Sequence, residues 1–197
     1  EFDRFGVPME EARERFDDSL RLLVKLLTEE EVSWSSKYYN FATLTITPRP
    51  VQKPCPPIWI AAMHEASISW AVENGYPVMT TPLRDPFAAA KMQADAFTAA
   101  KAKAGERARV SRMSMLRNAY VGTNDADVKE KVGFGLTKQR QFANVFNTPG
   151  EVHRGKIKLL DIPVTEEEIA NNIIIGTPGR CVEMLERYQA LGIDNLM

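Results

Sequence analysis

Apolar and charged positions alternate with the period of a helix near the start of the chain. Between residues 8 and 27 an apolar side chain recurs every three or four positions, and the opposite side is charged. This pattern predicts an amphipathic helix. Pro8 suits its first position, because proline has no N–H and an N–H there would have no partner within the helix. Two β-forming runs, residues 32–34 and 38–41, then predict a hairpin.

From residue 58 onward, apolar runs alternate with helical patterns. The runs at 58–62, 77–81 and 114–122 predict buried strands, and residues 193–197 predict a fourth. Helices are expected at 65–73, 86–104, about 125–146 and 178–191, and a shorter one after the capping box of Thr165 and Glu168. Residues 147–164 show no period and predict a long loop without regular structure.

Strands that alternate with helices indicate parallel βα units. Both a doubly wound sheet and a (β/α)8 barrel contain such units. The doubly wound dinucleotide fold should carry a glycine-rich turn between strand and helix, and none is present. A whole barrel needs about 250 residues. We therefore expect an α/β protein of the TIM-barrel type, in which residues 1–197 form a single domain that supplies the carboxyl-terminal half to five-eighths of the barrel.

The composition argues against several classes of binding partner. The 25 Lys and Arg residues nearly balance 26 Asp and Glu residues, giving a net charge of -1, so the chain lacks the basic excess expected for nucleic-acid binding. No apolar run approaches the ~20 residues that cross a bilayer, and the charged start does not read as a signal peptide. Two cysteines are too few for a disulfide framework or metal cluster. We expect a cytoplasmic protein without metal, nucleic-acid or membrane partner.

Three segments, in order, resemble the bacterial-luciferase-like flavin-dependent monooxygenases. The central one is IWIAAMHEASISWAVENGYPVMTTPL, residues 58–83. Before it, EFDRFGVPMEEARERFDDSLRLL and PRPVQKPCPPIWIAA are similar to the family's fourth helix and the lead into its fifth strand. After it, IIIGTPGRCVEMLERYQALGIDNLM resembles the approach to the eighth strand. The resemblance covers nearly the whole chain and implies the second half of the barrel.

This resemblance also implies a cofactor site. In the family, the flavin phosphate lies where the fifth strand meets the next helix, held by backbone N–H groups and a short hydroxyl side chain. A helix N-terminus suits an anion because its first amides are unsatisfied and carry partial positive charge. The corresponding corner here runs from Ala62 through Met63 and His64 to Ser67. Thr80, at the end of the next strand, is expected beside the flavin ring.

Each of these assignments has a simpler alternative. His64 could bind phosphate, act as a base near the flavin, or be a surface histidine in a first helical turn. Ser67 could be a plain helix-start residue, and Thr80 could be β-branched strand filling. The family's acid–base candidates come from strands one to four, which are not among these 197 residues. The catalytic residues are therefore unknown from this chain.

The implied reaction uses reduced FMN and O2 to oxygenate a small organic substrate. A separate flavin reductase would deliver the FMN, and the enzyme is expected to be a homodimer. Residues 147–164 would close over the flavin as a lid. Two alternatives remain open: a deazaflavin-dependent dehydrogenase of the same fold, and a non-catalytic barrel subunit in which Met63-His64, standing where the family often has Glu-Ser, marks a lost flavin site.

Overall fold

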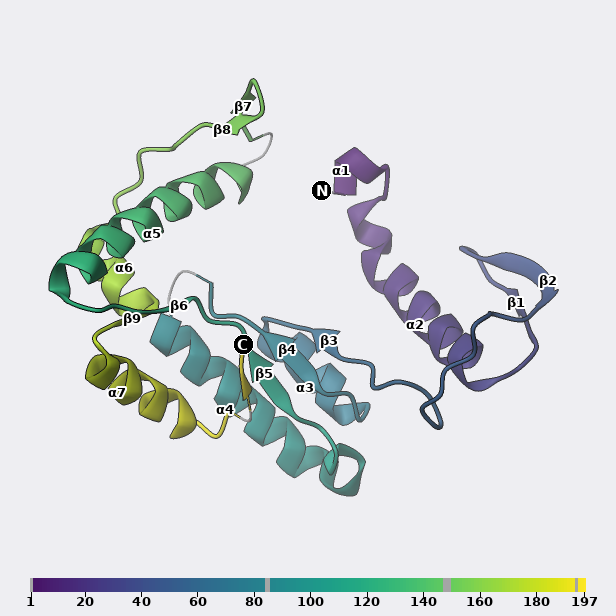
Figure 1. Cartoon of the computed structure of the whole chain (residues 1–197). Coiled ribbons are helices and arrows are strands. Elements are labelled where there is room, and N and C mark those ends of the chain that lie inside the picture. Colours follow the sequence, from purple (N-terminus) through teal and green to yellow (C-terminus); the bar gives the residue numbers. More distant parts are fainter. Residues whose placement is uncertain (1, 84–85, 147–149, 194) are drawn as a thin grey trace. The chain divides into compact units, whose positions relative to one another are not determined.

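The computed structural model describes residues 2–83, 86–146, 150–193 and 195–197. Its internal contacts divide the chain into two compact units, Glu1–Ile58 and Trp59–Met197. Figure 1 labels their helices and strands. No helix in the described part of the chain has both the length and the hydropathy needed to cross a membrane.

The first unit contains the predicted helix and hairpin. A short helix α1 (Phe2–Phe5) precedes a 3₁₀ turn η1 (Met9–Glu11) and the long helix α2 (Ala12–Thr28). The strands β1 (Val32–Ser35) and β2 (Asn40–Leu44) pair antiparallel. The prediction of one helix over residues 8–27 is thus confirmed except for its first turn, which is 3₁₀ and directly follows Pro8.

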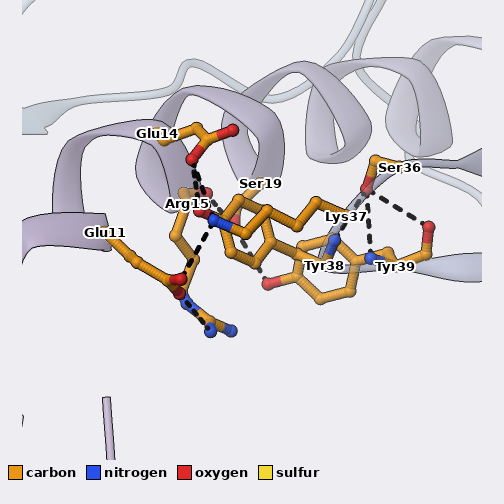
Figure 2. Close-up of polar contacts among 8 residues, drawn as sticks. All are labelled: Glu11, Glu14, Arg15, Ser19, Ser36, Lys37, Tyr38 and Tyr39. Carbon is orange, nitrogen blue, oxygen red and sulfur yellow. Dashed lines mark hydrogen bonds and ion pairs between the residues drawn. The ribbon is translucent and has the colours of Figure 1, made fainter. Parts of the chain in front are cut away.

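Polar side chains of η1 and α2 contact the hairpin turn (Figure 2). The Tyr38 hydroxyl donates a 2.7 Å hydrogen bond to Glu14, and the Lys37 ammonium lies 2.9 Å from Glu11 and 3.3 Å from Glu14. The bond from Tyr38, followed by that from Lys37, holds the pKa of Glu14 below its usual range. Exposed ion pairs contribute little to stability, so this cluster mainly sets how the hairpin turn lies on the helix.

The second unit is built on a four-stranded parallel sheet with the order β10-β5-β4-β3. Helices α3 (Glu65–Glu73) and α4 (Pro86–Ala104) follow β3 and β4, and the turn η2 (Gly105–Ala108) leads into β5. The four strands are Ile60–Ala61 (β3), Val78–Thr80 (β4), Met113–Met115 (β5) and Asn195–Leu196 (β10). The predicted parallel βα arrangement is confirmed.

The third predicted strand is in fact two strands. β5 pairs with β4 and β10, whereas β6 (Ala119–Val121) pairs in parallel with β9 (Ile174–Gly176) in a separate sheet. At the break, the Arg117 N–H donates to the carbonyl of Met197, and the Asn118 carbonyl accepts from Ile174. Prediction of one strand over 114–122 was wrong because both halves favour extended backbone, and only the change of partner separates them.

Three further helices complete this unit: α5 (Asp125–Phe146), α6 (Glu166–Asn172) and α7 (Pro178–Gln189). Val132, Ile169 and Ile175 form a buried cluster between α5, α6 and β9. The predicted capping box is confirmed, since Thr165 Oγ1 accepts from the Glu168 N–H and the Glu168 carboxylate accepts from the Thr165 N–H.

The predicted loop over residues 147–164 contains regular structure. Residues 147–149 lie outside the described part, but β7 (Val152–His153) and β8 (Lys156–Ile157) form a small antiparallel hairpin. Asn144 of α5, which is 2% exposed, donates to the carbonyls of Glu151 and Lys158 at 2.7 Å and accepts from the Glu151 N–H. The expectation of no regular structure was wrong for this part. Its closure over a flavin stays a prediction.

Ile68 of α3 tests the core of the second unit. Its side chain is 0% exposed, so Ile68→Ala should lower the free energy of unfolding by about 2–5 kcal/mol, through lost burial and a residual cavity. Chemical denaturation measures this change. Val182→Ala on α7, where the side chain is 53% exposed, serves as the control and should shift stability by less than about 0.5 kcal/mol. Equal losses in both variants contradict this description of the core.

Asp127 gives a pH prediction. Hydrogen bonds from Thr123 and then Tyr120 hold the pKa of Asp127 below its ordinary value of 3.8. A lowered pKa in the folded state stabilises the protein above the ordinary pKa, and this contribution is lost as pH falls through the lowered one. Asp127→Asn should therefore lower the melting temperature at neutral pH, and the gap to wild type should close on acidification. Asp161→Asn, at a fully exposed carboxylate, should show no comparable convergence in the same melting series.

Candidate functional site

The corner between β3 and α3 is formed by residues 62–64. Ala62 is 4% exposed, and its N–H donates to the carbonyl of Met79 at 2.9 Å. His64 is the N-cap residue of α3, with extended backbone, and its side chain makes no capping hydrogen bond. Helix geometry leaves the N–H groups of Glu65 and Ala66 without an intrahelical acceptor. The corner is therefore an uncapped helix N-terminus directly beyond a parallel strand.

The structure brings the sequence-predicted corner residues together. Met63 is 38% exposed, His64 is exposed, and Ser67 is half-buried in the first turn of α3. The N–H of Ser67 already donates to the His64 carbonyl at 3.0 Å, so Ser67 offers an anion its hydroxyl and not its amide. Glu65 adds an exposed carboxylate to the same turn. The polar side chains available here are thus His64, Ser67 and one acid that repels anions.

Gln93 of α4 is a site residue that sequence reasoning missed. It is 3% exposed, and its Nε2 donates 3.1 Å hydrogen bonds to the carbonyls of both Met63 and Thr81. One amide thereby links the corner after β3 to the end of β4. The available signal was an amide among the small apolar residues of α4, next to Ala94 and three positions after Ala90. Such a residue is expected to satisfy buried backbone groups.

Strand pairing decides which side chains share a face of the sheet. The register aligns Ala61, Met79, Ser114 and Asn195, one residue from each strand. In this row Met79 is 38% exposed and Ser114 is 5% exposed. Since side chains alternate along a strand, Thr80 points to the opposite face from Met79. Neither Met79 nor Ser114 was selected from the sequence, because an isolated strand does not reveal which of its faces is open.

Thr80 lies in the buried row. Its side chain is 4% exposed, and its hydroxyl has no hydrogen-bond partner among the described residues. Its backbone carbonyl accepts from the N–H of Leu116, which ties the ends of β4 and β5 together. A contact between Thr80 and a flavin ring stays a prediction.

A cavity of about 680 Å³ lies beyond the carboxyl ends of β4 and β5. Thr81 and Leu83 reach it from the end of β4, and Leu116 and Arg117 from the end of β5, while α5 and α6 supply most of the remaining walls. Parallel α/β proteins bind their ligands at this edge of the sheet. The cavity and the β3–α3 corner both follow strand ends of the same sheet, so they define one candidate region for a cofactor and a substrate.

These features describe an α/β protein of parallel βα units with a candidate ligand site at the carboxyl ends of its strands. The family model of the luciferase-like monooxygenases matches residues 1–195 of this chain. The chain belongs to this family. The resemblance drawn from the three sequence segments is confirmed.

Two curated relatives are flavin-dependent by name. The oxygenase component of a flavin-dependent trigonelline monooxygenase from Acinetobacter baylyi is 28% identical over 87% of this chain and 49% of the relative. An FMNH(2)-dependent dimethylsulfone monooxygenase from Pseudomonas putida is 24% identical over 100% of this chain and 56% of the relative. The chain thus spans about half the length of the curated relatives it matches.

Solved structures share the fold. The monooxygenase RslO1 from Streptomyces bottropensis superposes with a TM-score of 0.73 at 24% identity, over 99% of this chain and 56% of that one. An F420-dependent secondary alcohol dehydrogenase superposes with a TM-score of 0.64 at 16% identity, over 94% and 56% of the two chains. The luciferase-like α/β fold is shown by these matches, and the chain represents about half of it.

Gln93→Leu tests the link between the strand ends. The variant leaves the carbonyls of Met63 and Thr81 without their shared donor, so we expect the free energy of unfolding to fall by about 2–4 kcal/mol. Denaturation compared with Gln189→Leu, an exposed position on α7, separates this loss from a general effect of replacing glutamine. A Gln93→Leu protein as stable as the control would show that the amide does not hold the corner.

Proposed function

We propose that the chain is the carboxyl-terminal half to five-eighths of a single-domain (β/α)8 barrel, and that the whole protein is a monooxygenase. It uses reduced FMN and O2 to oxygenate a small organic substrate. The observation that carries the proposal is the uncapped N-terminus of α3 beyond β3, in a chain of the luciferase-like monooxygenase family. The flavin-dependent relatives support the choice of cofactor.

The corner suits a flavin phosphate on chemical grounds. The backbone amides of Met63, His64 and the first turn of α3, together with the partial positive charge of the helix end, bind an anion without a basic side chain. The Ala62 amide is already bonded to Met79 and does not take part. The Ser67 hydroxyl adds one donor. Gln93 holds the Met63 carbonyl in place, so the corner is preorganised. When bound, reduced FMN supplies the electrons that activate O2, and the residues of this chain position it.

A deazaflavin is the second candidate for the cofactor. The F420-dependent alcohol dehydrogenase shares the fold with this chain, and a deazaflavin cofactor would make the enzyme a dehydrogenase. A non-catalytic subunit is the third candidate, since Met63-His64 replaces the family's frequent Glu-Ser pair. Phosphate contacts from backbone amides do not depend on side-chain type, which favours a working flavin site over a lost one.

The proposed partners follow from the proposed reaction. One relative is named as an oxygenase component, which supports delivery of reduced FMN by a separate flavin reductase. We further propose a homodimer in the cytoplasm, where Cys55 and Cys181, both free thiols, would remain reduced.

Ser67→Ala in the intact protein tests the phosphate site. Loss of a hydrogen bond to a charged group should weaken reduced-FMN binding by about 1–3 kcal/mol, measured by anaerobic fluorescence titration. Riboflavin, which has no phosphate, should bind wild type and variant equally. Glu65→Gln is the matched change in the same turn, and it should strengthen FMN binding at low ionic strength because it removes a repelling carboxylate. Unchanged FMN affinity in Ser67→Ala removes Ser67 from the site.

A further inference from the structure

Arg117 is a buried cation that pairs with no carboxylate of the described residues. Its side chain is 8% exposed, and the Nη2 group donates to the backbone carbonyl of Asn172. Its guanidinium carbon lies 5.5 Å from the centre of the Tyr188 ring. Within the described part of the chain, no carboxylate forms an ion pair with it, and its Nε is buried without an acceptor. An unpaired buried charge is unfavourable, so such a group favours binding of an anion.

The backbone around Arg117 is held on both sides. Its N–H donates to the carbonyl of Met197 after β10, and the carbonyl of Asn118 accepts from Ile174 at the start of β9. The residue therefore sits where the chain leaves the four-stranded sheet for the β6–β9 pair. Tyr188 is also fixed, because its ring packs edge-on against Phe87 at 5.7 Å between centroids. The guanidinium is thus held by Asn172 of α6 and Tyr188 of α7, and the Arg117 backbone by Met197.

The cavity beside Arg117 is apolar and basic. Its α5 wall presents Phe134 and Val145, which are 59% and 54% exposed, to the open space. Large apolar side chains held open to solvent often mark a binding surface. The charged residues that line the cavity are Arg117 and the exposed Lys138; no acidic residue lines it within the described part of the chain. A volume of about 680 Å³ lies within the range of small-molecule sites.

We infer that this cavity takes an organic anion: a carboxylate that pairs with the Arg117 guanidinium and an apolar body that packs against α5. A guanidinium matches a carboxylate in charge and in its paired donors, and the phenyl and valyl side chains match a compact hydrocarbon. That the ligand is the substrate of oxygenation rests on the proposed function. The choice of a carboxylate rests on Arg117 and the cavity lining alone.

The experiment compares two isosteric probes on the intact protein. 2-Naphthoate and 2-naphthamide differ in charge but hardly in shape, and their binding is followed by calorimetry. Wild type should bind the naphthoate roughly 10- to 100-fold more tightly, the range expected for a hydrogen-bonded charge pair. Arg117→Met should abolish this preference, whereas Lys138→Gln, at the exposed cation, should keep most of it. The wild-type comparison needs no variant, so a misfolded Arg117→Met protein leaves the test intact.

Reduced FMN separates this inference from the proposed function. Arg117→Met should bind reduced FMN as wild type does, and FMN should not displace the naphthoate. Equal binding of the two probes to wild type overturns the inference, and so does competition by FMN, which would assign Arg117 to the cofactor phosphate. If the wild type prefers the naphthoate but does not bind reduced FMN, the anion site is supported and the proposed flavin-dependent monooxygenase activity is refuted.

Discussion

Parallel pairing of β3, β4, β5 and β10 is the constraint on which the rest of this structure depends. Because the four strands run in the same direction, their carboxyl ends meet at one edge of the sheet. After β3, β4 and β5 the backbone leaves the sheet, and several of its polar groups find partners outside the strand pairing. The α3 corner, the Thr81 and Leu83 turn and the Arg117 break all lie at such ends. Residues far apart along the chain are brought to the same edge for this reason.

Buried amides hold these turns in place. Gln93 donates to two carbonyls beyond β3 and β4, and Asn144 donates to two carbonyls of the β7–β8 segment while accepting from an N–H. In both cases one side chain on a helix satisfies backbone groups that have no partner in a sheet. Burial makes such hydrogen bonds costly to lose. These turns are thus fixed by hydrogen bonds to helices that lie far away along the chain.

The Oε1 of Gln93 is itself buried without a partner among the described residues. Arg117 and Thr80 share this situation. Both lie near the same strand ends and are more than nine-tenths buried, yet each has a polar atom without a partner among the described residues. Natural structures rarely leave such atoms unsatisfied without a functional reason. For Arg117, the adjoining cavity supplies one. For Thr80, whose hydroxyl points away from the open face, the structure offers no comparable ligand.

The sequence by itself determined the main helices and the fold class. The bounds of α3 and α4, the capping box at Thr165 and the parallel βα alternation follow from local periodicity and end signals, which act within a few residues. The corner after β3 was also predictable, since a strand followed by a helix start is a local pattern.

Only the tertiary structure decided that the predicted third strand is divided at Arg117. It alone also showed the hairpin held by Asn144, the two hydrogen bonds of Gln93 and the face of the sheet on which Thr80 lies. Each depends on a hydrogen bond or strand register with a distant segment. The residues of a single element do not specify such partners, because propensity describes the backbone of one segment and pairing requires two.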